Sequence, residues 1–208
     1  MIFSGCQDKT FKRIKNEFER DREILYDEEL LKSFIFKAIE EKRTEDKFWD
    51  FKLMLEYWKP ECQVKEKKIY EFCENIAAFA NSEGGLIIIG ISNEDPRKIF
   101  DIKKVEIRAN DCGGKIRKFC DYKKLFYEIR ILKIEDSDGV SKNCIVIAVK
   151  QTSDVVGVKI GTGKVSYQIR VDLQAVPFDK EIIKDNKKEI VFDNLKFLNN
   201  IKKYTISS

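Results

Sequence analysis

The chain contains no histidine in its 208 residues. This absence excludes Ser-His-Asp and Cys-His catalysis, histidine general bases, HExxH zinc peptidases and Cys2His2 zinc fingers. Any catalysis here therefore has to proceed without an imidazole.

Cysteine pairs and long apolar runs are also missing. The six cysteines contain no CxxC pair, so neither an ordinary zinc site nor a compact disulfide framework follows from them. The amino terminus has no sustained apolar segment of the kind found in signal peptides, and no apolar run approaches about 18 residues. We therefore expect reduced cysteines, a cytoplasmic location and no membrane partner.

The charge balance is only mildly basic. Forty Lys and Arg face 36 Asp and Glu, which gives a net charge of +4, and hydrophobic residues make up 43%, enough to bury a core. A weak positive excess permits a nucleic-acid partner without requiring one. The only phosphate-loop-like stretch, residues 161–164, lacks the required glycine spacing, and Val165 replaces the Ser or Thr that would meet magnesium. We therefore expect no nucleotide cofactor.

Hydrophobic periodicity predicts a mixture of helices and strands. Three- and four-residue steps predict helices over 30–38 and 69–80, and a continuous β-branched run predicts a buried strand at 86–89. Further strand-like segments are 48–57, a hairpin over 127–151 and a second hairpin over 156–172; the tail from 182 is expected to be helical. These elements predict an α+β fold with a mixed, largely antiparallel sheet and flanking helices. The expected organisation is an N-terminal helical extension (1–29), a main domain (30–181) and a C-terminal helical tail (182–208).

Three segments in order, TEDKFWDFK, NIAAFANSEGGLIIIGIS and SYQIRV followed by Pro177, resemble the Schlafen AlbA_2 domain family. The most specific block is FANSEGGLIIIGIS. Physically, its Gly-Gly turn joins a helix to a strand, and two interpretations stay open: a structural joint, or a turn whose exposed amides cradle a phosphate. The resemblance implies nucleic-acid binding, to RNA or DNA, or the metal-dependent cleavage of structured RNA such as tRNA that some members perform.

In the nuclease members three carboxylates form the active site. The resemblance carries the first two onto Glu45 and Asp50, which would hold Mg²⁺ or Mn²⁺. At the third position the chain has Ser92 and Asn93 in place of an aspartate, so Asn93 is a candidate metal ligand and Glu94 or Asp95 a candidate catalytic acid. The alternative is that Glu45 is an exposed helix-end acid and that Asp50 is an ion-pair partner of Lys52 or Arg97.

Basic residues between 103 and 133 outnumber the acids there. A nucleic-acid surface requires such residues on one side of the molecule, where they release counterions from phosphates. The candidates are Lys52, Arg97, Lys98, Lys103, Lys104, Arg117, Lys118, Lys123 and Lys124. Tyr122, Phe126 and Tyr127 lie within this run and either stack on bases or belong to the core. The resemblance adds Arg170, of the Y-x-I-R-V strand, as a ligand contact or a support for an acid.

Three functional hypotheses follow. The first is a protein that binds the phosphate backbone of RNA or DNA. The second is a metal-dependent endoribonuclease that uses the acids above. The third is a non-enzymatic interaction module, and a homodimer is expected by analogy with family members that place two related lobes around a groove.

Overall fold

The computed structural model describes residues 28–184, except 42–44, 46, 95, 96, 137, 162 and 172. The predicted N-terminal extension up to residue 27, and the tail beyond residue 184, lie outside the described residues. The elements in chain order are α2 (Glu28–Glu40), β1 (Trp49–Lys52), the 3₁₀ helix η2 (Glu56–Trp58), α3 (Lys65–Asn81), β2 (Gly85–Ile89), α4 (Val105–Phe119), η3 (Tyr122–Lys124), β3 (Tyr127–Glu135), β4 (Ser141–Val149), β5 (Gly157–Ile160), β6 (Lys164–Val171) and β7 (Gln174–Pro177).

A four-stranded mixed sheet in the order β1-β2-β4-β3 forms the centre of the molecule. Strand β1 runs parallel to β2, and the other two pairings are antiparallel. Strand β2 is buried along its whole length, which is why its sequence is continuously apolar instead of alternating. Within the described part of the chain, β1 and β3 are the outer strands of this sheet.

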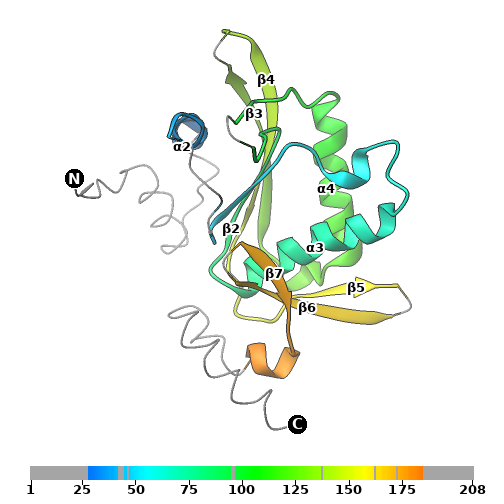
Figure 1. Cartoon of the computed structure of the whole chain (residues 1–208). Coiled ribbons are helices and arrows are strands. Elements are labelled where there is room, and N and C mark those ends of the chain that lie inside the picture. Colours follow the sequence, from blue (N-terminus) through cyan, green and yellow to red (C-terminus); the bar gives the residue numbers. More distant parts are fainter. Residues whose placement is uncertain are drawn as a thin grey trace, which may run out of the picture.

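Helices cover both faces of the sheet (Figure 1). On one face α2 packs Phe34 and Ile35, both 0% exposed, against Trp49 and Phe51 of β1. The ring centroids of Phe34 and Trp49 lie 5.2 Å apart in an edge-to-face arrangement. On the other face α3 and α4 pack over the opposite side chains of β2 and β4.

A second, antiparallel sheet, β5-β6-β7, packs against α3 (Figure 1). Asn81, at the end of α3, connects the two parts of the structure. Its side-chain amide donates to the carbonyls of Val156 (2.8 Å) and Gln168 (2.9 Å), and its Oδ1 accepts from the Val156 N–H (2.7 Å). Asn81 is therefore a bridge between the helix and the second sheet.

The predicted α+β fold is confirmed, as are the helix ending at the Gly-Gly turn, the buried strand and both hairpins. The predicted strand over 48–57 is too long. The chain leaves the sheet after Lys52 and enters η2, because Tyr57 and Trp58 are buried beside α3, where the Trp58 Nε1–H donates to Asp111 (2.9 Å). Helix α4 was not predicted, since Gly113 and Gly114 weaken its helical signal. Strand β7 was not predicted either.

No helix in the described ranges is both long and apolar enough to cross a membrane.

Candidate nucleic-acid interface and acid pair

Glu45 and Asp50 are brought together at the β1 edge of the sheet. Asp50 is 2% exposed and forms an ion pair with Lys52, whose Nζ lies 2.9 Å from the Asp50 Oδ1. Glu45 is half-buried, and its Oε1 accepts a hydrogen bond from the Phe51 N–H (3.1 Å). The ion pair predicted as the alternative for Asp50 is thus present with Lys52.

The pKa of Glu45 is raised to about 7, first by burial and then by its hydrogen bond to Asp50 and the repulsion between the two carboxyl groups. The Lys52 ammonium and the Phe51 N–H act in the opposite direction. Near neutral pH Glu45 is therefore partly protonated, as expected for a half-buried carboxyl group beside a second acid.

This raised pKa predicts a pH-dependent stability. The folded state binds the Glu45 proton more tightly than the unfolded chain does, so its contribution is fully present below about pH 4.5 and is lost as the pH rises through 7. Glu45→Gln removes the titrating group, and we expect it to reduce this loss of stability by about 1 kcal/mol. The expected effect is small because solvent screens a half-buried group. Urea unfolding midpoints at pH 5 and pH 8 measure it. Equal shifts for the parent and the variant would show that Glu45 titrates normally.

The segment at the third acidic position is held by other contacts. The Ser92 Oγ accepts from the Lys98 N–H (2.7 Å), and the Asn93 Oδ1 accepts from Arg97 Nη1 (3.1 Å). Glu94 is exposed, and Asp95 lies outside the described residues. Among the residues described, no three or more Cys, Asp or Glu side chains are grouped so as to hold a metal ion. Only Glu45 and Asp50 of the candidate acids are seen in contact.

A groove of about 520 Å³ lies at the carboxyl ends of the parallel strands β1 and β2. Lys52, Lys59 and Lys98 line it, together with Glu56 and Glu94. Its other lining residues are Phe51, Leu53, Met54, Ser92, Asn93 and Phe100. We call this cavity the lysine groove. Sequence reasoning missed Lys59, because nothing in its local sequence distinguishes it from other solvated lysines.

The other predicted basic residues are distributed over the molecule. Lys103 and Lys104 precede α4, while Arg117 and Lys118 lie in its last turn. With a rise of 1.5 Å per residue, the two ends of this helix are roughly 20 Å apart. Lys123 and Lys124 follow at the second end, in η3. These six basic residues therefore lie in two groups, one at each end of α4, and none of them lines the lysine groove.

Arg170 is 1% exposed, and this burial does not fit the expected ligand contact. Its Cζ lies 4.4 Å from the centroid of the Phe79 ring, and its backbone N–H donates to the Ser82 Oγ (2.8 Å). Arg97 likewise makes contacts within the protein. Its Cζ lies 4.3 Å from the centroid of the Phe51 ring, and its Nη1 donates to the Ser92 carbonyl. We therefore leave Arg170 out of the interface.

The Gly-Gly turn is a joint between α3 and β2. The N–H groups of Ser82 and Gly84 both donate to the Phe79 carbonyl and so close the end of α3. Gly84 has a φ of 78°, which favours glycine. At Gly85 a side chain would collide with the Phe79 ring. Because these two amides are occupied, the geometry favours the structural interpretation over the phosphate cradle.

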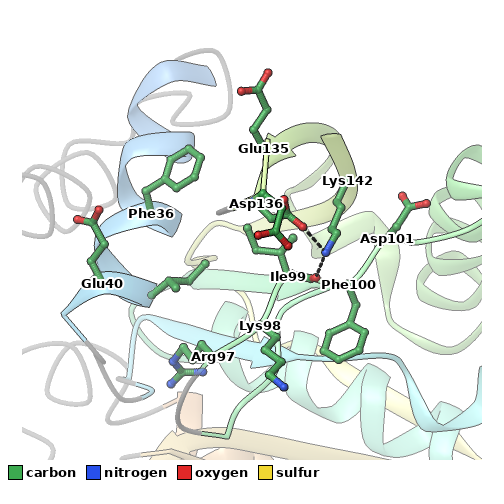
Figure 2. Close-up of a pocket in the computed structure, with 12 residues that line it drawn as sticks. Phe36, Glu40, Arg97, Lys98, Ile99, Phe100, Asp101, Glu135, Asp136 and Lys142 are labelled. Carbon is green, nitrogen blue, oxygen red and sulfur yellow. Dashed lines mark hydrogen bonds and ion pairs between the residues drawn. The ribbon is translucent and has the colours of Figure 1, made fainter. Parts of the chain in front are cut away.

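A second cavity, of about 640 Å³, lies beside α2 (Figure 2). Its walls include Phe36, Ile39, Ile99 and Phe100. Its carboxylates are those of Glu40, Asp101, Glu135, Asp136 and Asp138, and its cations are Arg97, Lys98 and Lys142. The Lys142 ammonium is bound to Asp136 and to the Ile99 carbonyl, as Figure 2 shows. We call this cavity the acidic cavity.

The fold and these features define a small α+β domain with a helix–Gly-Gly–strand joint, a carboxylate pair at a sheet edge and an adjoining lysine groove. The chain belongs to the Schlafen AlbA_2 family: the family model described as "Schlafen, AlbA_2" matches residues 45–191. This membership suggests a role related to nucleic acids.

Comparison with solved structures finds a similarity to the DIP2311 protein from Corynebacterium diphtheriae, with 14% sequence identity and a TM-score of 0.46. The match covers 71% of this chain but only 28% of that protein. No curated protein matches the chain.

Proposed function

We propose that this protein binds RNA or DNA through the phosphate backbone at the lysine groove. The observation that carries the proposal is the convergence of Lys52, Lys59 and Lys98, from three separate segments, on one groove in a member of this family. Lys59 is paired with Glu56 at 2.8 Å, but both side chains are substantially exposed. Such surface pairs contribute only about 0–1 kcal/mol, so the ammonium can exchange the carboxylate for a phosphate.

The test is a salt titration of binding to labelled tRNA and to single-stranded DNA. We expect the affinity of the parent to fall steeply with salt, because each neutralised phosphate releases counterions. The double variant Lys59→Ala/Lys98→Ala is expected to bind more weakly and to reduce the slope of log K against log salt by about 2. Lys52 is left unchanged in this variant because it also neutralises Asp50.

The matched control is Lys118→Ala/Lys123→Ala, in the last turn of α4 and in η3, neither of which lines the lysine groove. This pair removes the same charge and is expected to leave the slope close to that of the parent. Salt-insensitive binding, or equal losses in the two double variants, would contradict a site at the lysine groove. If nothing binds, the third hypothesis, a non-enzymatic interaction module, gains support.

A metal-dependent endoribonuclease is the second candidate, and the contact between Glu45 and Asp50 favours it. Two carboxyl groups forced together, one with a pKa of about 7, are typical of functional sites. Their oxygens are of the type that Mg²⁺ and Mn²⁺ prefer, but Asn93 is engaged by Arg97 and supplies no third acid. A cation bound there would polarise the scissile phosphate and lower the pKa of a bound water.

The same binding reactions, run with Mn²⁺, with Mg²⁺ and with EDTA and read for cleavage, test this candidate. Cleavage that requires the cation and disappears in Asp50→Asn would support it. Salt-sensitive binding without cleavage would support the binding function and contradict the nuclease activity. A homodimer and a cytoplasmic location stay predictions.

A further inference from the structure

Phe100 is an exposed aromatic side chain between the two cavities. It lines both the lysine groove and the acidic cavity, and 43% of it is exposed to solvent. Lys98, which also lines both cavities, precedes it by two residues, and the two side chains are seen together in Figure 2. Phe100 belongs to none of the three hydrophobic clusters formed by the described residues, so core packing does not explain an apolar ring in this position.

The backbone that carries Phe100 is firmly held. Its N–H donates to the Gly90 carbonyl (2.7 Å), and the preceding residue, Ile99, forms a β-bridge with Ile91. On the other side, the Asp101 carboxylate accepts hydrogen bonds from the Asn143 N–H (2.9 Å) and side-chain amide (2.8 Å). The ring is therefore presented on a fixed support, which lowers the entropic cost of binding a ligand on it.

The two cavities differ in the ligand groups that they admit. The lysine groove offers ammonium groups to phosphates, whereas carboxylates outnumber cations in the acidic cavity and repel them. Among the described residues Glu40, Glu135 and Asp138 form no ion pair, so the cavity keeps an excess of carboxylates over the cations Arg97, Lys98 and Lys142. An uncharged base avoids that repulsion and gains apolar contact with walls such as Phe36 and Phe100.

We propose that Phe100 stacks on an unpaired base, so that the ligand crosses this part of the protein as a single strand with its phosphates in the lysine groove and a base at the mouth of the acidic cavity. This proposal rests on the proposed function and adds the class of nucleic acid. Aromatic side chains stack on all four bases, so the selection is for unpaired bases and not for a sequence. In a duplex the bases are stacked on one another and cannot cover the ring.

Fluorescence anisotropy with the full chain tests the proposal. The probes are a labelled 12-nucleotide oligouridylate, the same strand with abasic positions, and a 12-base-pair duplex. We expect Phe100→Ala to weaken binding of the oligouridylate about tenfold, the range that stacking on one base supplies. Binding of the abasic strand and of the duplex should change less than about twofold, since neither places a base on the ring.

Two further variants make the outcome specific. Phe100→Trp should retain binding, whereas Phe100→Leu, which keeps an apolar surface without an aromatic face, should behave like Phe100→Ala. Phe126→Ala removes an aromatic side chain that is 65% exposed and lies two residues beyond Lys124, and it should leave all affinities unchanged.

The possible failures separate the two proposals. If Phe100→Ala weakens the single strand and the duplex equally, or if Phe100→Leu binds like the parent, base stacking is wrong while the lysine groove stands. If the parent binds none of these probes or tRNA at any salt concentration, the proposed function is wrong and the inference fails with it.

Discussion

Replacing Asn81 with alanine is expected to lower the free energy of unfolding by about 3–5 kcal/mol. The side chain is 0% exposed and satisfies three backbone groups, the carbonyls of Val156 and Gln168 and the N–H of Val156. A buried polar group left without its partner costs about 1–3 kcal/mol. Three such groups lie within one small region, so a single water molecule restores only part of the loss.

Urea unfolding followed by circular dichroism measures this loss. Asn75→Ala is the matched control, because it is the same substitution in the same helix; the Asn75 side chain donates only to the Glu71 carbonyl one turn earlier and is partly exposed. We expect the control to lose less than about 1 kcal/mol. Similar losses in the two variants would show that the bridge between α3 and the second sheet does not contribute to stability.

Gly85→Ala is expected to destabilise the protein by about 2–3 kcal/mol, although the change adds one methyl group. A Cβ at this position would lie 2.2 Å and 2.3 Å from two carbon atoms of the Phe79 ring and 2.8 Å from the Phe48 carbonyl oxygen. Phe79 is 0% exposed, so its ring has no solvent space into which it can move. Either the ring leaves its position or the pairing of β1 with β2 shifts.

Gly114→Ala provides the control for this prediction. A Cβ there has no atom within 4 Å, and the position is inside α4, where alanine is favoured over glycine by about 1 kcal/mol. The two Gly→Ala changes should therefore have opposite signs in thermal unfolding. The double variant Gly85→Ala/Phe79→Leu should recover part of the loss. A neutral Gly85→Ala would mean that the close packing of this joint is not required.

These two positions explain why the FANSEGG block was the most informative part of the sequence. The Gly-Gly turn at Gly84 and Gly85 was expected to join a helix to a strand. The turn is present, but Asn81 acts on a different sheet and Gly85 is needed because of the Phe79 ring. The motif was recognisable from local sequence, while the reason for two of its residues depends on segments 75 or more positions away and on the packing of one ring.

The candidate site was predicted less completely. The family resemblance placed Glu45 and Asp50, five positions apart, in one acidic site, and the two carboxyl groups are in contact in the structure. Lys59 and Phe100 were missed, since each lies in an irregular segment. Only the fold shows that both line the same groove as Lys98. The spread of the basic residues over both ends of α4 could not be recognised before that helix was known.

The sequence by itself determined the chemistry that is excluded, the buried strand β2, the helix before it and the two hairpins, because periodicity and turn residues act over a few neighbouring positions. The tertiary structure alone decided which charges meet. It buried Arg170 and brought Lys59 to the same groove as Lys98. Electrostatic contacts depend on distances in space between distant segments, and those distances are set only when the helices dock on the sheet.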